Sequence, residues 1–439
     1  MVLNPDHKIG KIKRRIYLKD IFIISISAFG GAGAHLSSLL KRLVHEKKYL
    51  SEKEFFEIYS FCQMLPGPTS TETITAIGMK LGGHRLALYT LLLWIFPATL
   101  IMTSIVLLLN FYDSKGADLS FTRLLQPMAV AYIFKAAIDL LQNFKSDSLY
   151  KKLFIASATL AVAFKNPLIF PIILGLAGYI SFKKRDFVPS HNPNPVKIKW
   201  KNLILFFSLF ILAALAGFLI KAQLGKDANE AIPVLLFENN YRFGTLVFGG
   251  GNVLIPMMFE QFVRFKQYLS PQEFILGVGI NQALPGPVFS VATYMGGMIL
   301  KDWGWIWQVL GCIIASIGIY TPGLLFIYFL FPIWDYFKNT SWINKSMPGI
   351  SAASAGLVLS GAILLMVPTI FDVKGLDNLH LFTIINEWSF VIHNYSFDVI
   401  NFLFIIISYL IIRYTKIAPT LMVVLTTLLG FLINFDWII

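Results

Sequence analysis

Two Pro-Gly-Pro sequences within apolar segments are the features of this chain that point most clearly to chemistry. Proline inside a helix removes a backbone hydrogen bond, so each sequence predicts a helix that begins anew within an apolar segment. The first N–H groups of such a helix are free and carry partial positive charge, which favours the binding of an oxyanion. The predicted substrate-binding residues around these turns are Gln63, Pro66, Gly67, Pro68, Thr69, Ser70, Gln282, Pro285, Gly286 and Pro287.

Both turns belong to a longer internal repeat. Residues 29–79 align without a gap with residues 248–298, at an offset of 219, and 17 of the 51 pairs are identical. Most identities are glycine, proline, aromatic or polar residues, which indicates duplication. Each copy opens with Phe-Gly-Gly, whose glycines are predicted to bring helix backbones together at the same site. These glycines are Gly30, Gly31, Gly249 and Gly250. The alternative is that both motifs serve only helix kinks and packing.

The composition defines the fold class. The 439 residues are 56% hydrophobic and 14% charged, with a mean hydropathy of +0.67. A soluble domain carries about 25% charged residues, whereas many apolar runs here have about 20 residues, the length that crosses a bilayer. We therefore predict an all-α polytopic membrane protein. The net charge of +13 lies mostly between the apolar runs, as the positive-inside rule describes, and does not indicate nucleic acid. Residues 41–53 are the main exception to that rule.

The sequence indicates no enzyme, cofactor or metal site. Cys62 and Cys312 lie in apolar surroundings, so we expect neither a disulfide nor a metal-binding cluster. The phosphate-binding sequence of ATP-driven pumps does not occur, and neither do the common zinc-protease, dithiol or serine-hydrolase motifs.

The apolar runs group as six spans, one linking span and six further spans. An odd number of spans between two copies turns the second copy over in the membrane. We therefore predict about 13 transmembrane segments, as an inverted repeat of two six-span halves with broken Pro-Gly-Pro helices. The N-terminal repeat covers residues 1–183, a basic cytoplasmic linker covers 184–202, and the linking span with the C-terminal repeat covers 203–439. The N-terminus is predicted to be cytoplasmic and uncleaved.

The predicted boundaries near the motifs are specific. Residues 1–20 are predicted as a basic arm, and residues 21–40 and 243–262 as single spans that contain the Phe-Gly-Gly sequences. Residues 82–85 are predicted as an inside loop between two spans, and residues 225–240 as an outside loop.

Ionisable residues inside spans are costly and are therefore functional candidates. Four are candidates for ion coupling or for shaping the local potential: His35, Glu72, Lys80 and Lys135. A carboxylate at Glu72 would repel an anion unless protonated, which suits proton coupling; a water-facing position near the interface is equally consistent. Packing or an interfacial position explains His35 better. A structural ion pair with Asp139, four residues later, explains Lys135 better.

The two copies also resemble a known family. The first half contains FGGAGAHL and YLSEKEFFEIYSFCQMLPGPTST, and the second contains FGGGNVLIPMM and YLSPQEFILGVGINQALPGPVFSVATYMGG. These blocks are similar to the two signatures of the chromate ion transporter family in its long, two-domain form. The resemblance implies an inner-membrane exporter of chromate, driven by the proton gradient, with sulfate as a competitor. Carried over by position, it adds Phe29, Phe248 and Phe289 to the residues named above.

Two positions depart from the pattern of that family. Glu72 stands where glutamine is expected, and Ala32 stands where proline is expected. The substrate therefore stays open between chromate and another tetrahedral oxyanion such as sulfate. A non-transporting membrane scaffold is the alternative from another class, and assembly as a homodimer is also open.

Overall fold

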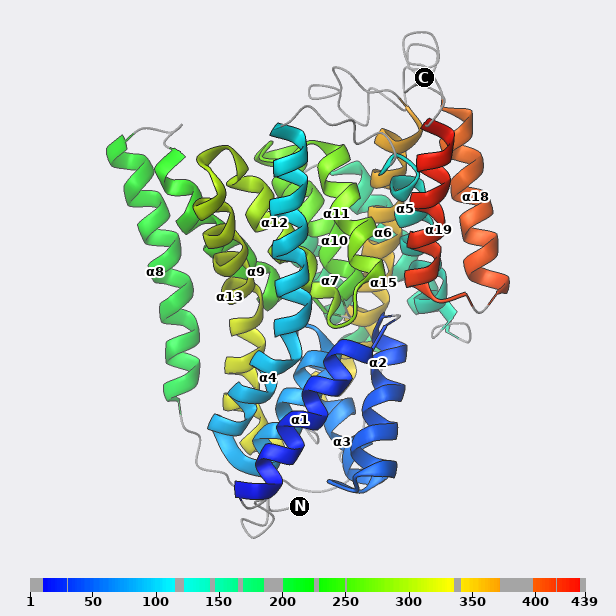
Figure 1. Cartoon of the computed structure of the whole chain (residues 1–439). Coiled ribbons are helices and arrows are strands. Elements are labelled where there is room, and N and C mark those ends of the chain that lie inside the picture. Colours follow the sequence, from blue (N-terminus) through cyan, green and yellow to red (C-terminus); the bar gives the residue numbers. More distant parts are fainter. Residues whose placement is uncertain are drawn as a thin grey trace. The chain divides into compact units, whose positions relative to one another are not determined.

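Figure 1 shows the computed structural model of the chain. It describes residues 11–29, 31–114, 122–142, 147–164, 169–184, 200–224, 229–248, 251–334, 341–371, 398–415 and 417–434. Within these ranges the regular elements are helices, and no extended strand occurs. The predicted all-α class is confirmed for this part of the chain.

The chain forms two compact units, each assembled from three segments. Unit 1 comprises residues 1–108, 186–251 and 284–344, and unit 2 comprises the rest. The helices of unit 1 are α1 (Lys11–Ser27), α2 (Gly31–Leu39), the π-helix η2 (Leu40–Glu46), α3 (Glu52–Gln63), most of α4 (Thr69–Ser114), α8 (Lys201–Leu224), α9 (Ile232–Leu246), α12 (Val291–Ile299) and α13 (Trp305–Leu330). Those of unit 2 are α5 (Leu125–Gln142), α6 (Ser148–Ala163), α7 (Ile169–Lys184), α10 (Leu254–Met258), the π-helix η6 (Phe259–Phe265), α11 (Pro271–Ala283), most of α15 (Ser341–Ile370), α18 (Val399–Tyr414) and α19 (Pro419–Asn434).

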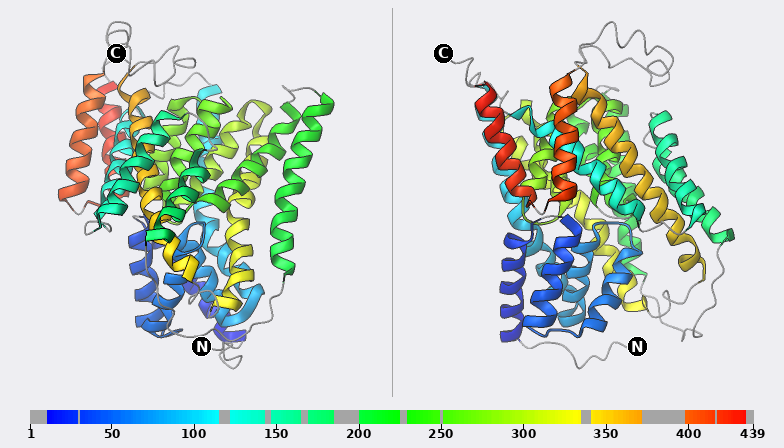
Figure 2. Two further views of the ribbon diagram at one scale, coloured as in Figure 1. Left: turned by 180° about the vertical axis from the view of Figure 1, so that it is seen from behind. Right: turned by 90° about the vertical axis from the view of Figure 1, so that its right-hand side faces the viewer.

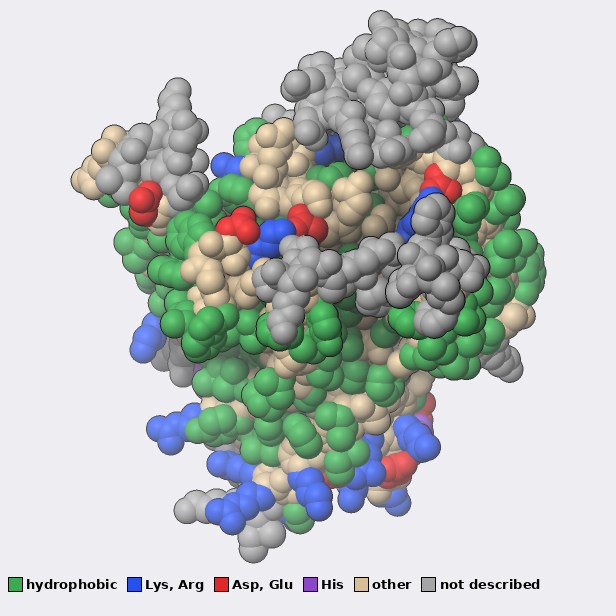
Figure 3. Space-filling model, turned by 45° about the horizontal axis from the view of Figure 1, so that its top comes forward, with side chains coloured by type: hydrophobic (Ala, Val, Ile, Leu, Met, Phe, Trp, Pro, Cys, Tyr) green, Lys and Arg blue, Asp and Glu red, His purple; other side chains and the backbone are tan. Residues whose placement is uncertain are grey.

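Several helices are suited to a bilayer. In the described part of the chain, four stretches are long and apolar enough to cross a membrane: Thr69–Tyr112, Lys201–Ile220, Trp305–Ile333 and Asn344–Ile370. Hydrophobic side chains cover most of the described surface on the face drawn in Figure 3. On α8, Ile204, Leu212 and Phe218 are 63%, 63% and 69% exposed. Such exposure of large apolar side chains fits a lipid-facing helix, so the chain is a multi-pass membrane protein.

The longest of these stretches is two helices. Trp94 Nε1 donates a hydrogen bond to Thr71 Oγ1 over 3.0 Å. A straight helix would separate residues this far apart in sequence by about 35 Å. The chain instead turns back at Gly83, whose φ of 76° lies in the left-handed region. The predicted loop at residues 82–85, between two apolar segments, is confirmed as this turn.

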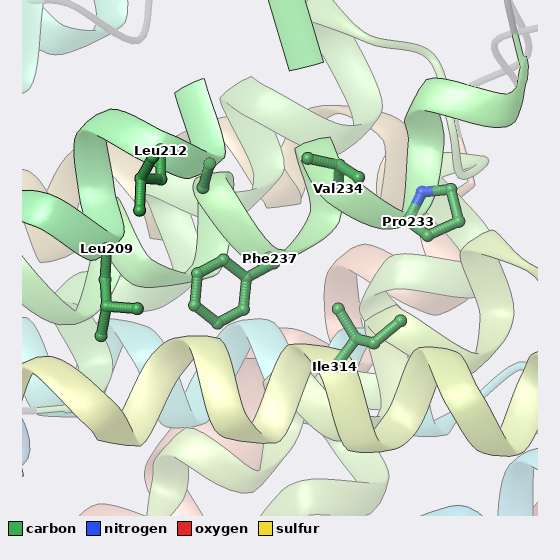
Figure 4. Close-up of a pocket in the computed structure, with 7 residues that line it drawn as sticks. Leu209, Leu212, Pro233, Val234, Phe237 and Ile314 are labelled. Atoms are coloured by element: carbon green, nitrogen blue, oxygen red, sulfur yellow. The ribbon is translucent and has the colours of Figure 1, made fainter. Parts of the chain in front are cut away.

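In unit 1, α8, α9 and α13 lie side by side (Figures 1 and 2). Between them is an apolar pocket of about 420 Å³ (Figure 4). It is lined by Leu209, Leu212, Ala213, Pro233, Val234, Phe237 and Ile314. In unit 2, α5 packs against α11, α18 and α19. The long α15 passes close to α7 and α6, because a side chain on Gly349 or Gly356 would collide with backbone of those helices.

The internal repeat is reproduced in backbone detail. The π-helices Leu40–Glu46 and Phe259–Phe265 occupy equivalent positions, 219 residues apart. Each is followed by a residue with positive φ, Lys48 at 51° and Gln267 at 52°. Each next helix has the same capping pattern, in which a serine and the glutamate three residues later bond to each other's backbone N–H groups. The sequence repeat is therefore also a structural repeat.

The Phe-Gly-Gly sequences correct two predicted spans. Helix α1 ends at Ser27 and α9 ends at Leu246, the equivalent position, so residues 21–40 and 243–262 are not single helices. Glycine weakens helices, and the carbonyls of Ala28 and Val247, just after these ends, accept hydrogen bonds from outside their own helices. Two further boundaries were wrong. Helix α1 already begins at Lys11, within the predicted arm, and α9 begins at Ile232, within the predicted outside loop.

Close backbone contact between α12 and α13 leads to a stability prediction. A Cβ atom on Gly296 or on Gly311 would collide with the carbonyl oxygen of the other glycine. We expect Gly311→Val to lower the free energy of unfolding by about 2 kcal/mol or more, because the helices must separate. Thermal unfolding of the detergent-solubilised protein measures this. Gly175→Val is the control, since the space beside Gly175 is open; equal losses in both variants would contradict the prediction.

Candidate functional site

Two crossed hydrogen bonds join the copies within unit 1. The Gly67 N–H donates to the Val247 carbonyl over 2.6 Å, and the Gly286 N–H donates to the Ala28 carbonyl over 3.1 Å. Gly67 and Gly286 are equivalent, and so are Ala28 and Val247. The glycine of each Pro-Gly-Pro turn thus bonds to the residue just before the Phe-Gly-Gly sequence of the other copy. Both glycines have positive φ, 132° and 101°, a conformation that favours glycine.

The helices that follow the turns are short. The first leg of α4 runs from Thr69 to the turn at Gly83, and the second copy has a helical stretch from Val288 to Ile299. At 1.5 Å per residue these stretches are about 20 Å long, less than the roughly 30 Å of a hydrocarbon core. The prediction that a helix begins anew after each Pro-Gly-Pro is therefore confirmed.

Polar side chains gather at the start of α4. His35 of α2 is 1% exposed, and its Nδ1 lies 3.2 Å from Ser70 Oγ. The ring of His35 also meets Trp94 edge-on, with centroids 5.4 Å apart. Trp94 in turn donates to Thr71. These contacts hold the first turn of α4 against α2, and they give His35 the packing role favoured from sequence together with a polar contact at the site.

Glu72 lies in the same turn and is 2% exposed. Neither carboxyl oxygen has a hydrogen-bond partner among the described residues. Its Oε1 occupies the space that a side chain on Gly67 would need, and a Cβ atom on Gly323 of α13 would lie 3.2 Å from it. The carboxyl group therefore lies over the Pro-Gly-Pro turn at the N-terminal end of α4. The alternative predicted from sequence, a water-facing position for Glu72 near the interface, is wrong because the side chain is buried.

The second copy lacks this polar group. The residues equivalent to Ser70, Thr71 and Glu72 are Phe289, Ser290 and Val291, and the residue equivalent to His35 is Leu254. Phe289, Ser290 and Val291 are all buried. The two turns share a backbone geometry but differ in chemistry, so only the first brings an ionisable side chain to a helix start.

The other predicted site residues lie as follows. Pro66, Pro68, Pro285 and Pro287 are buried in the two turns, and Thr69 is half-buried. Gln63 is exposed at the end of α3, whereas Gln282 is half-buried near the end of α11 in unit 2. Gly31 begins α2, and Gly30, Gly249 and Gly250 lie outside the described residues. The structure thus joins each turn to a helix end of the other copy but leaves the Gln63 side chain exposed.

The predicted cations are paired. The Nζ atom of Lys80 lies 2.6 Å from Oε1 of Glu54 on α3. Burial raises the pKa of Glu54, but hydrogen bonds from Lys80 and Ser51 outweigh it and lower the pKa to about 2. In unit 2, Lys135 pairs with Asp139, which also pairs with Arg413. The predicted structural ion pair of Lys135 is confirmed.

Helix α1 carries a buried acid that was not among the predicted site residues. Asp20 is 2% exposed and accepts hydrogen bonds from Arg42 at 2.7 Å and from the Tyr49 hydroxyl at 2.7 Å. Burial, together with the bond to Asp20, raises the pKa of Tyr49. These bonds join α1 to the charged segment 41–53, which had been the exception to the positive-inside pattern. The available signal was that Asp20 is the one acidic residue of α1, directly after a stretch rich in lysine and arginine. Within the described ranges, no three His, Cys, Asp or Glu side chains converge as a metal site requires.

Comparison with known proteins identifies the family. The sequence model described as "Chromate transporter" matches residues 17–181 and 234–431, one region for each copy. The chain belongs to the chromate transporter family. A chromate transport protein of Pseudomonas aeruginosa is 22% identical over 332 residues, covering 75% of this chain and 76% of that protein.

Two other relatives of this chromate transporter family member cover more of its length. A probable chromate transport protein of Synechococcus elongatus is 21% identical over 82% of this chain and 86% of its own. An uncharacterized transporter of Methanocaldococcus jannaschii is 23% identical over 82% of this chain and 87% of its own. No solved structure matches. The resemblance stated from the motifs is thus confirmed across both halves.

The crowding at Gly67 predicts that a side chain at this position lowers the stability of the protein. Alanine at position 67 would need an unfavourable positive φ and would displace the Glu72 carboxyl. We expect Gly67→Ala to destabilise the protein by about 1–3 kcal/mol. Thermal unfolding in detergent measures it. The control is Gly175→Ala, within α7, where the space for a side chain is open; it should be neutral or slightly stabilising. A neutral Gly67→Ala would show that the turn is not constrained.

The Glu54–Lys80 pair predicts a pH dependence. The pKa of Glu54 falls from its ordinary 4.5 to about 2 on folding. The pair therefore stabilises the fold fully above pH 4.5, and this stabilisation is lost as the pH falls from 4.5 towards 2. We expect a contribution of about 1 kcal/mol, since the pair is partly exposed. Melting temperatures of the wild type and Lys80→Met, measured across this range, should converge on acidification; a constant difference would contradict the prediction.

Proposed function

We propose that this protein exports chromate across the inner membrane by secondary active transport, coupled to the proton electrochemical gradient. Membership of the chromate transporter family supports the substrate class. The observation that carries the proposal is the crossed pair of hydrogen bonds between the two Pro-Gly-Pro turns and the two helix ends. In inverted-repeat transporters the substrate site lies between two equivalent elements, and these bonds join two equivalent elements of this chain.

The anion is proposed to bind at the first turn of α4. The N–H groups at the start of this helix have no partner within the helix and favour negative charge. The hydroxyls of Thr69, Ser70 and Thr71 lie in the same turn. The Thr71 hydroxyl accepts a hydrogen bond from the indole N–H of Trp94. Backbone N–H groups and hydroxyls suit a tetrahedral oxyanion, because they donate without adding a charge that would hold the ion too tightly.

The two copies are proposed to form an inverted repeat of about 13 segments with a cytoplasmic N-terminus. In the crossed bonds, the turn of each copy contacts the equivalent helix end of the other copy. This reciprocal arrangement supports a repeat around one central site. The proposed boundaries, residues 1–183 and 203–439 around the linker 184–202, contain the two matched family regions. A homodimer is compatible with this arrangement.

Sulfate is the proposed competing anion. Backbone N–H groups at a helix start bind the oxygens of an oxyanion, so they respond to its shape and charge rather than to its central atom. Chromate and sulfate are both tetrahedral dianions, so the geometry supports binding of either.

Flux in reconstituted vesicles tests the function. We expect labelled chromate to move at a rate that depends on an imposed proton electrochemical gradient, and unlabelled sulfate to slow it. Protein-free vesicles are the control. Folded, reconstituted protein that moves neither anion would overturn the transport proposal and favour a scaffold role.

A double variant tests the site. Pro66→Ala with Pro285→Ala restores the missing N–H groups and allows the helices to continue through the turns. We expect flux to fall by at least about tenfold, the equivalent of one lost interaction of about 1.4 kcal/mol. Pro348→Ala, within α15 of unit 2, is the matched control. Full flux in a correctly inserted double variant would exclude the turns as the site.

A further inference from the structure

The Glu72 carboxyl and the proposed anion require the same space. Glu72 is 2% exposed, lies in the first turn of α4, and has both oxygens unpartnered in the described structure. Its Oε1 lies over Gly67, just before the N–H groups proposed to bind the anion. A helix start alone would not define a site, but a buried, unpartnered carboxyl directed at it is a second and independent feature.

We propose that Glu72 must take up one proton before the oxyanion binds, so that this chain binds one proton with each anion. An ionised carboxylate can only accept hydrogen bonds and repels a second anion, whereas the protonated acid has an O–H group to donate to one. Protonation therefore converts Glu72 from a competitor of the substrate into a ligand of it. This inference rests on the proposed function and assigns the coupling to one residue.

The surroundings of Glu72 offer no other charge to take this role. From α3 the buried Cys62 thiol interacts electrostatically with Glu72. From α13 the facing residue is Gly323, and from α2 His35 reaches the neighbouring Ser70. Lys80, further along α4, is paired with Glu54. Among the described residues no lysine or arginine forms an ion pair with Glu72, so a proton is the available counter-charge.

The asymmetry of the repeat sets the stoichiometry. Val291 is the equivalent residue in the second copy, so each chain contains one such carboxyl. A dianion and one proton together carry one net negative charge. If the empty carrier returns with Glu72 ionised, the proton leaves with the anion, and an inside-negative membrane potential drives this net charge outward. Coupling to the gradient would then be electrical, and the pH difference would oppose export.

Binding measured against pH tests the proposal. The purified full chain in detergent is titrated with labelled chromate, and with labelled sulfate, which stays a dianion while chromate gains a proton in mildly acidic solution. We expect wild-type affinity for sulfate to fall about tenfold for each pH unit above the pKa of the carboxyl. Glu72→Gln should bind with near-maximal affinity at every pH. Glu57→Gln, an exposed glutamate of α3, is the matched control and should keep the wild-type profile.

The outcomes separate the two proposals. A pH-dependent wild type beside a pH-independent Glu72→Gln supports the inference. Equal profiles in the wild type and Glu72→Gln overturn it and leave the transport function intact. No binding of either anion by any variant overturns the proposed function and this inference with it. In vesicles, a trapped pH dye should report one proton moved with each anion in the wild type and none in Glu72→Gln, whose melting temperature confirms its fold.

Discussion

The constraint on which the structure depends is that backbone groups buried in an apolar environment must find partners. Each Pro-Gly-Pro turn interrupts a helix and exposes an amide, and each helix end before a Phe-Gly-Gly sequence exposes a carbonyl. The structure resolves both problems with one arrangement, since the Gly67 and Gly286 amides bond to the Val247 and Ala28 carbonyls. In lipid an unsatisfied backbone group is costly, so the breaks in the two copies depend on each other.

This mutual dependence has consequences for function. A helix that starts at a broken turn presents free N–H groups at its first turn, and its partner copy holds that turn in place. The short helices after the turns are fixed at one end by the crossed bonds. The first ends at the turn at Gly83, and the second ends at Ile299, shortly before Gly304; both glycines have positive φ. Rigid, short helices that end inside the protein can orient their dipoles at a substrate.

The copies have diverged in side chains while keeping their backbone. Equivalent π-helices, positive-φ residues and capping patterns recur 219 residues apart. The first copy carries Glu72, His35 and the Asp20–Arg42 pair, and the second has Val291, Leu254, Asn239 and Gln261 at those positions. Duplication supplied the backbone geometry twice, and divergence left an ionisable side chain at only the first of the two turns.

The sequence by itself determined the helical membrane class, the repeat and the places where the Pro-Gly-Pro sequences interrupt a helix, but not the helix ends before the Phe-Gly-Gly sequences. These depend on local properties: runs of apolar residues, and the inability of proline and the reluctance of glycine to continue a helix. Only the tertiary structure decided which groups meet. Trp94 contacts Thr71 because α4 turns back at Gly83, Lys80 is neutralised by Glu54 of another helix, and Glu72 is buried without a partner. Such pairings depend on how helices distant in sequence pack, and no local preference of the chain specifies them.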